Sequence, residues 1–415
     1  MKENIFITND ATTLGLLFLF LGLIFYTQTL KTGFFKKFYT YVPALLLCYF
    51  IPGLLNSFHI IDGETSKLYF VASRYLLPAC LILLTLSVDL KEIIKLGPKL
   101  ITVFLAGTFG VIIGGPIAIL SVKYMFPTVF SGLELEDVWR GMTTVAGSWI
   151  GGGANQASMK EVFQVNDKIF SIMVVVDVLV ANVWMAILLF LAPRAKEFDQ
   201  KFKADSSSID RLKNKLEEYE NTQSKITTLN DLMFICALAF SLTGLAHFMA
   251  DGIAPFIGEY APFLSKFSLT SKFFWLIVLA TCFGVGLSFT KVKSLESVGA
   301  SKVGNIFLYV LIASIGMHMN IFEIFKNPGI FLIGGIWMLV HAVVILTVGR
   351  LVKAPLFFIA VGSQANIGGA ASAPVVAGFF HPSLAPIGVL LAVFGYVLGT
   401  YGAWLCGIFM QFVAS

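Results

Sequence analysis

The sequence predicts an all-α integral membrane protein, built from two inverted repeats with glycine-broken or re-entrant segments and about 10 to 13 membrane crossings. Long charge-free runs, a similarity between the two halves of the chain and the placement of lysine and arginine support this prediction. Of the 415 residues, 57% are hydrophobic and 13% are charged, whereas soluble domains hold roughly 25% charged residues. This composition excludes an ordinary soluble domain. The net charge of +5, spread over many loops, argues against a nucleic-acid partner.

Apolar runs follow one another along the chain. A helix of about twenty apolar residues crosses the roughly 30 Å hydrocarbon layer of a membrane. The last segment, 354–415, has no charge but is interrupted by glycine and proline, and it is too long for one helix. Nine earlier runs lack Asp, Glu, Lys and Arg, except for Asp177 in the fifth: 11–30, 38–61, 75–88, 100–122, 169–193, 232–250, 273–290, 303–322 and 327–349.

A charged segment divides the chain in two. Residues 194–231 hold eight basic and eight acidic side chains and three consecutive serines, which is typical of a solvated linker. We therefore expect a first membrane repeat over 1–193, with an extra N-terminal span, and a second membrane repeat over 232–415.

The two halves are similar at two places. Residues 86–100 align without gaps on residues 317–331, and GSWIGGGANQAS at 147–158 recurs loosely as GSQANIGGAASA at 362–373. Each glycine-rich segment follows a long apolar run and precedes the last run of its half. A duplication explains this order; shared composition of membrane helices is the alternative, because apolar sequences align easily.

The loop charges indicate how the halves are related. If the N-terminus lies outside and both glycine-rich segments dip in and return, 19 of the 29 Lys and Arg residues lie in cytoplasmic loops. The same arrangement brings the aligned segments 86–100 and 317–331 to opposite faces, which makes the repeats inverted. If the glycine segments cross fully, the linker moves outside and the repeats become parallel, unless 252–268 adds a crossing. We therefore predict ten spans and two re-entrant hairpins.

Both glycine-rich segments are predicted to line a substrate site. Non-helical backbone within a membrane requires protein or a water-filled cavity around it, and glycine lets the chain take positive φ and lets a ligand approach the backbone. Close helix packing by small residues is the alternative. The predicted substrate-binding residues are Ser148, Gly151, Gly152, Gly153, Asn155, Gln156, Ser363, Gln364, Asn366, Gly368, Gly369 and Ser372.

Asp177 is the predicted ion-coupling residue. It lies near the middle of run 169–193, five residues before Asn182, so both side chains could lie on related faces of one helix. A carboxylate in a membrane is costly unless it is paired, hydrated or neutralised. We expect Asp177, with Asn182, to bind Na⁺ or to exchange a proton; a buried aspartate with a purely structural role is the alternative.

No pattern in the sequence favours an enzyme. The chain has no GxSxG elbow, no Walker loop, no HExxH spacing and no pair of intramembrane aspartates. Its five cysteines are scattered singly, without the spacing of a metal site. We expect no catalytic residue and no cofactor other than Na⁺ or H⁺ as the coupling ion, with Asp177 as the only candidate metal ligand.

At the glycine-rich segments, and above all at GSWIGGGANQAS, the chain resembles the YjcL-like family of bacterial multi-spanning proteins, a domain of unknown function, over essentially its whole length. Its inverted halves also make it similar, more distantly, to the group that holds glutamate, citrate and bile acid–sodium symporters and sodium–proton antiporters. That resemblance implies a scaffold beside a mobile core, a frequent homodimer, and a site between 151–156 and 366–369. The residue before Asp177 is Val176, so the adjacent acidic pair of many antiporters is missing.

These observations lead to three functional hypotheses. The first is an ion-coupled secondary transporter of the plasma membrane that carries a small polar or anionic organic solute by alternating access. The second is a cation–proton antiporter that uses Asp177. The third is a membrane sensor or scaffold that recruits a partner through residues 194–231. Membrane lipid and a small solute are the expected partners in the first case.

Overall fold

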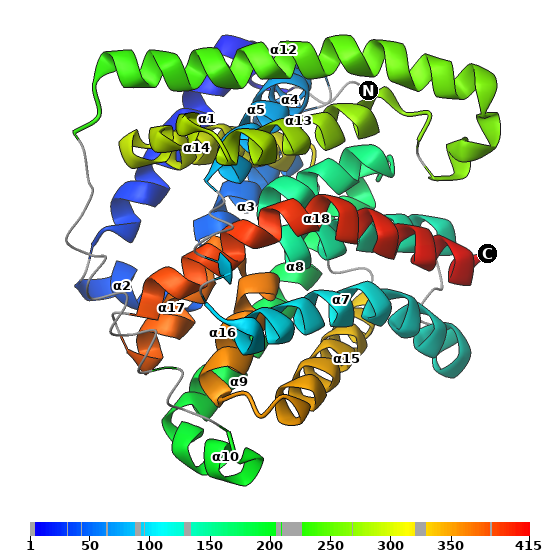
Figure 1. Ribbon diagram of the computed structural model, residues 1–415. Coiled ribbons are helices and arrows are strands. Elements are labelled where there is room, and N and C mark those ends of the chain that lie inside the picture. Colours follow the sequence, from blue (N-terminus) through cyan, green and yellow to red (C-terminus); the bar gives the residue numbers. More distant parts are fainter. Residues whose placement is uncertain are drawn as a thin grey trace.

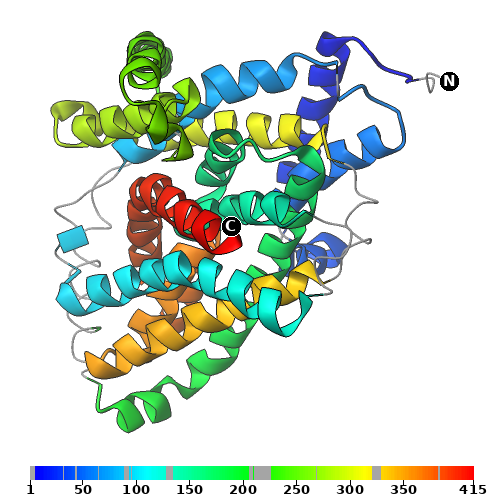
Figure 2. The ribbon, with the colours of Figure 1, turned by 90° about the vertical axis from the view of Figure 1, so that its right-hand side faces the viewer.

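The chain is a helical membrane protein, and the computed structural model places its helices in two layers (Figures 1 and 2). The aligned residues Glu92, Lys95, Glu323 and Lys326, and most of the charged linker, lie outside the described part of the chain. The structure describes residues 5–30, 32–42, 44–63, 65–87, 93–94, 96–127, 134–204, 209, 226–267, 269–319, 329–381 and 384–415.

Capping side chains mark the beginning of several helices. The Asn166 side chain accepts the N–H of Ile169 at the start of α9, and Thr228 and Asp231 form a reciprocal capping box at the start of α12. The helices are α1 (Asp10–Gln28), α2 (Gly33–Tyr41), α3 (Ala44–Ser57), α4 (Leu68–Val71), η1 (Ala72–Leu76), α5 (Leu77–Leu86), α7 (Pro98–Met125), α8 (Leu135–Val162), α9 (Asp167–Leu191), η3 (Ala192–Arg194), α10 (Ala195–Phe202), α12 (Leu229–Tyr260), η4 (Pro262–Phe267), α13 (Lys272–Ser288), η5 (Lys291–Val298), α14 (Ala300–Gly316), α15 (Ile330–Leu351), α16 (Leu356–Ile367), α17 (Gly369–Phe380) and α18 (Ala385–Ala414).

Among the described residues, seven helices are long and apolar enough to cross a membrane, and two bent pairs raise this number to nine. The apolar helix α14 is shorter, with 17 residues, and the ten spans expected from the sequence are reached only if it is counted as well. In chain order, α1, α3, α5, α7 and α9 precede the linker, and α12, α13, α14, α15 and α18 follow it. Each half therefore contributes five such segments.

The helices form two groups, which we call the scaffold group and the core group. In the scaffold group, α5 packs on α13 and α14, α12 packs on α13, and α1 packs on α3. In the core group, α8 packs along α18, α7 packs along α15, and α16 contacts α7 and α18. Figure 1 shows the scaffold group above the core group. Each group draws on both halves of the sequence.

The first glycine-rich segment is the tip of a re-entrant hairpin, formed by α8. The chain reverses at Gly152, whose backbone has φ 70° and ψ −173°. Near the two ends of α8, Arg140 Nη1 donates a hydrogen bond to the Phe163 carbonyl (2.8 Å), and Asn166 Nδ2 donates to Asp137 Oδ1 (3.0 Å). Since both ends lie together, α8 enters and leaves on the same side.

The second glycine-rich segment forms a second hairpin, from α16 and α17. The chain turns at Gly368 and Gly369, and Gly369 has φ 57°. The rings of Phe357 and Phe380, at the open end, are 5.3 Å apart. The re-entrant arrangement predicted from loop charges is therefore the one observed, and a full crossing at either glycine segment is not.

Helix α9 shows that the hairpins enter from opposite faces. It begins beside the first hairpin, where Asn166 bonds Asp137. After its far end, Asp199 Oδ1 in α10 accepts the N–H of Leu356, the first residue of the second hairpin (2.7 Å). The 25 residues of α9 span roughly 37 Å, the thickness of a membrane. This geometry gives the repeats their inverted relation.

Candidate functional site

The tips of the two hairpins meet. A methyl group added to Gly369 would lie 3.9 Å from the Cα of Gly152. Both glycines have positive φ, which a residue with a side chain rarely adopts. The two broken segments therefore join inside the molecule, as the sequence predicted.

Two asparagines fasten the hairpins to neighbouring helices. Asn155 Nδ2 donates to the carbonyls of Gly151 and Tyr396, and its Oδ1 accepts from Thr400 in α18 (2.7 Å). Asn366 Nδ2 donates to the carbonyls of Gly362 and Phe104, and its Oδ1 accepts from Thr108 in α7 (2.7 Å). Both amides are fully buried. Because these contacts use both ends of each amide, the two asparagines position the tips.

Asp177 lies close to the middle of α9 and is buried against the first hairpin. Trp149 Nε1 donates to its Oδ1 (2.7 Å), and Gln156 Nε2 donates to its Oδ2 (2.9 Å). The Tyr49 hydroxyl, in α3, donates to Gln156 Oε1 (3.1 Å). Among the described residues no cation pairs with Asp177, so neutral donors alone hold this carboxyl group. The chain Asp177–Gln156–Tyr49 connects the core group to the scaffold group.

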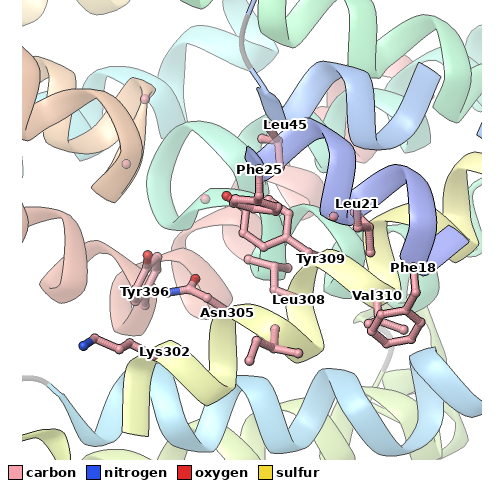
Figure 3. A pocket seen from close by; sticks show the side chains of 16 residues that line it. Phe18, Leu21, Phe25, Leu45, Lys302, Asn305, Leu308, Tyr309, Val310 and Tyr396 are labelled. Carbon is pink, nitrogen blue, oxygen red and sulfur yellow. The ribbon is translucent and has the colours of Figure 1, made fainter. Parts of the chain in front are cut away.

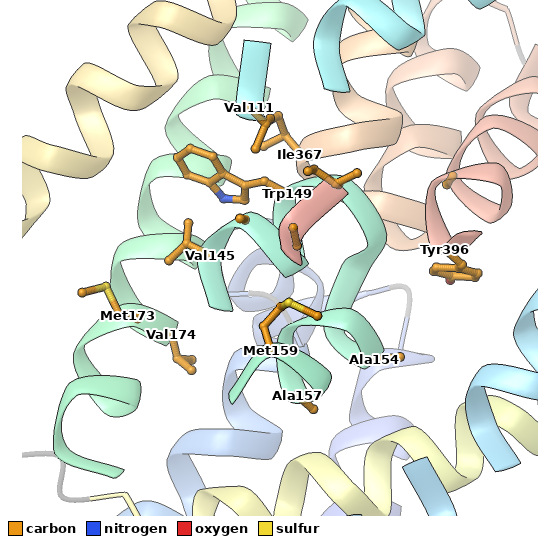
Figure 4. Packing of buried hydrophobic residues seen from close by; sticks show 14 of the residues in the cluster. Val111, Val145, Trp149, Ala154, Ala157, Met159, Met173, Val174, Ile367 and Tyr396 are labelled. Carbon is orange, nitrogen blue, oxygen red and sulfur yellow. The ribbon is translucent and has the colours of Figure 1, made fainter. Parts of the chain in front are cut away.

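Trp149 connects several elements around Asp177. Figure 4 shows its ring among Val111 of α7, Val145 of the first hairpin and Ile367 of the second. Its ring also lies 5.0 Å from that of Trp337 in α15. The indole thus fills the core with its ring and binds Asp177 with its N–H group.

Ser363 belongs to a hydrogen-bonded cluster on the second hairpin. Its Oγ lies 2.7 Å from Trp184 Nε1 and 2.7 Å from His341 Nε2. His341 Nδ1 contacts the Gly107 carbonyl, which can only accept, so Nδ1 carries the proton and Nε2 accepts from Ser363. His341 is therefore a satisfied core histidine in this structure.

Gln364 carries an orphaned acceptor close to the second tip. Its Nε2 donates to Ser372 Oγ across the turn (2.7 Å). Its Oε1 is buried and, among the described side chains, has no hydrogen-bond partner. Buried acceptors without a partner are rare in proteins. This oxygen can accept a hydrogen bond from a water or a ligand, or coordinate a cation.

The other predicted site residues are placed as follows. Ser148 is buried on the first hairpin, and Gly153 and Gly368 border the cavity described below. Asn182 is half-exposed, and its amide donates to the Val178 carbonyl in its own helix (2.7 Å). The structure therefore does not join Asn182 to Asp177: five residues along a helix turn the side chain well away.

A cavity of about 640 Å³ reaches the meeting point of the tips. It lies between α1, α14 and α18, and Figure 3 shows its labelled side chains. Its described lining consists of Phe18, Leu21, Gly22, Phe25, Leu45, Gly152, Gly153, Lys302, Asn305, Ile306, Leu308, Tyr309, Val310, Gly368, Gly369 and Tyr396.

The cavity residues of α14 were not predicted from the sequence. Lys302, Asn305 and Tyr309 recur at positions i, i+3 and i+7, which places them on one face of a helix. The polar face of this otherwise apolar span can be recognised in the sequence. The sequence does not show that this helix packs beside the hairpin tips.

A polar network lines part of a second cavity, of about 540 Å³. Arg74 in η1 pairs with Glu161 on the returning arm of the first hairpin (3.0 Å), and Tyr69 in α4 donates to Glu161. Lys160 bonds the Tyr69 hydroxyl (3.1 Å) and pairs with Asp167 (2.9 Å). We call these five residues the latch network. It joins the scaffold group to the first hairpin at its open end.

The chain is similar to a protein named as a membrane protein. The chain is 27% identical over 364 residues to the "Uncharacterized membrane protein YjcL" of Bacillus subtilis (strain 168). The aligned region covers 84% of this chain and 85% of that protein. Residues 15–413 match the family described as "Protein of unknown function (DUF819)". The chain therefore belongs to the DUF819 family of proteins.

Proposed function

We propose that the protein is a secondary active transporter of the plasma membrane that carries a small polar or anionic organic solute, driven by Na⁺ or H⁺. The observation that supports this most directly is the meeting of two re-entrant tips at a cavity of about 640 Å³ that both tips line. Broken helices at such a point offer unpaired backbone groups to a solute and an ion. Asp177 is the proposed ion-coupling residue.

Alternating access is supported by the asymmetry between the two ends of the molecule. Lys302, at one end of the cavity, is in the first turn of α14. Ser87, after the end of α5, and Ser301 both donate to Glu296 (2.6 and 2.5 Å), so α5 ends where α14 begins. The latch network lies at the start of the same α4–α5 span. Lys302 and the latch network thus lie near opposite ends of the same span.

The coupling step would proceed through the first hairpin. Its returning arm carries Gln156, which bonds both Asp177 and Tyr49, and Glu161, which bonds Arg74. Binding of a cation or proton to Asp177 would weaken the hydrogen bond that its carboxyl group accepts from the Gln156 N–H group. The hairpin would then release its contact with the scaffold group, which permits the core group to move.

Reconstitution of the purified full-length protein into liposomes tests this function. We expect an inward Na⁺ or proton gradient to drive accumulation of at least one organic anion from a panel of carboxylates and amino acids, above the external concentration. Liposomes without protein serve as the control. Absence of accumulation under every gradient contradicts the proposal, and cation–proton exchange without any organic solute would establish the antiporter instead.

The latch network predicts a second result. Substitution Glu161→Gln removes the charge that pairs with Arg74 and should shift the protein toward opening at this face. The pair is partly buried, so its loss of about 1 kcal/mol should shift the population roughly fivefold. Labelling of a single cysteine, Asn305→Cys in a chain otherwise free of cysteine, by an impermeant maleimide applied at the latch face measures the change.

The matched control is Glu136→Gln. Glu136 pairs with Arg140 one turn away on the same hairpin (2.7 Å) and does not reach the scaffold group. We expect E136Q to label at the wild-type rate. Equal labelling of E161Q and E136Q would contradict a latch at Glu161.

A further inference from the structure

Four polar groups face the cavity without a protein hydrogen-bond partner among the described residues. They are the Lys302 ammonium, the Asn305 amide and the hydroxyls of Tyr309 and Tyr396. Tyr396 is only 8% exposed, and it lines the cavity. Figure 3 shows Lys302, Asn305 and Tyr396 gathered on one side. A few polar groups that converge on an otherwise apolar pocket are typical of a ligand site.

The charge of this cavity selects the sign of the ligand. Lys302 is the one ionised side chain in the described lining, and that part of the lining holds no Asp or Glu. All four polar groups can donate hydrogen bonds. An anionic group gains from all of them, whereas an ammonium group would meet Lys302 with no countercharge.

The apolar side chains of the cavity determine which kind of ligand body fits it. Leu21, Phe25 and Leu45 come from α1 and α3, and Leu308 and Val310 come from α14. A strongly polar solute would lose hydration against these side chains without replacement. An apolar body of moderate size suits the wall and the volume of about 640 Å³. A single Lys provides one positive charge, which suits one carboxylate better than two.

We infer that the cavity binds an organic monocarboxylate with an apolar body, its carboxylate at Lys302, Asn305 and Tyr396 and its body against α1. This inference rests on the proposed function, since it takes the cavity as the solute site. It adds a substrate class and assigns Lys302 as the counter-ion. Neither the tip residues nor Asp177 specify that class.

Binding to the detergent-purified full chain, without any gradient, tests the inference. The probes are 3-phenylpropanoate, 4-methyl-2-oxopentanoate and octanoate, each with its neutral amide and, for 3-phenylpropanoate and octanoate, the matching primary amine. We expect at least one carboxylate at a hundredfold its Kd to raise Tm by about 3 °C. The amides and amines should leave Tm unchanged. Stabilisation by none of the carboxylates, or equal stabilisation by an amine, overturns the inference.

Two pairs of variants locate the site. Lys302→Gln should abolish the carboxylate-induced shift, while Lys291→Gln, an exposed lysine in η5 outside the cavity lining, should retain it. Gly22→Leu should fill the cavity, because no atom lies within 4 Å of an added Cβ there, and Gly15→Leu on the same helix meets equally open space outside the cavity lining. We expect loss of the shift in G22L alone. An unchanged shift in both K302Q and G22L places the carboxylate elsewhere.

The outcomes separate this inference from the proposed function. Carboxylate binding without gradient-driven uptake would support the substrate class and contradict coupled transport. Gradient-driven uptake of a solute other than a monocarboxylate, together with no binding of the probes, would support transport and overturn the substrate class.

Discussion

Substitution Asp177→Asn should abolish gradient-driven uptake and leave the protein folded. The amide has nearly the shape of the carboxyl group but cannot bind Na⁺ as an anion or exchange a proton. Its oxygen can still accept from Trp149, and Gln156 can turn its own amide so that its oxygen meets the N–H group of the introduced amide. Tyr49 can then accept instead of donate, because a hydroxyl group does both. The buried polar groups keep hydrogen-bond partners, so the protein stays folded, while the charge that binds the coupling ion is lost.

Two measurements separate coupling from folding in this variant. Net uptake under an Na⁺ or proton gradient should fall at least 100-fold, to the level of liposomes without protein, while Tm stays within a few degrees of wild type. The control is Asp251→Asn, which removes an exposed carboxylate paired with Lys272 (3.0 Å) on the scaffold group. Wild-type uptake by D177N at all ion concentrations would contradict the role of Asp177.

The second large effect is expected at Gly399, where α18 receives the first hairpin. A Cβ at this position would lie 2.4 Å from the Cα of Gly151 and 2.6 Å from Asn155 Nδ2. The Cα cannot rotate out of the way as a side chain can. Gly399→Ala should therefore push the hairpin from α18, strain the Asn155 bonds to Tyr396 and Thr400, and separate the tips. Overpacking of this kind costs about 1–3 kcal/mol.

We expect G399A to lower Tm by several degrees and to reduce gradient-driven uptake at least tenfold. Gly286→Ala in α13 is the matched control, because no atom lies within 4 Å of a Cβ placed there. That substitution should leave both quantities near wild type. If G399A has the Tm and the uptake of G286A, the tight contact of the first hairpin with α18 is not required for function.

Much of the fold could be predicted from the chain because its determinants are local. Charge-free runs specify apolar helices, since a helix satisfies its own backbone in lipid. GSWIGGG and NIGG specify breaks, because consecutive glycines permit the positive φ found at Gly152 and Gly369. The excess of Lys and Arg in alternate loops predicted which loops lie on the cytoplasmic side. That orientation in turn predicted re-entrant hairpins and inverted repeats.

The roles of individual site residues were harder to predict. Asn155 and Asn366 were expected to bind a solute, yet each is occupied by a neighbouring helix that is distant in sequence. Asn182 was expected beside Asp177, yet Trp149 and Gln156 are the partners of that carboxyl group. These pairings depend on which helices pack together, which local sequence does not specify.

The sequence by itself determined that this protein lies in a membrane, that two glycine segments interrupt its helices, and that Asp177 stands in mid-span. Composition and short-range backbone preferences are sufficient for each of these conclusions. Only the tertiary structure decided that the tips touch, that Tyr49 reaches Asp177 through Gln156, and that Lys302 lines a cavity beside the tips. Contacts between helices far apart in the chain arise from the packing of whole helical faces, and a single face is compatible with several partners until the complete bundle is formed.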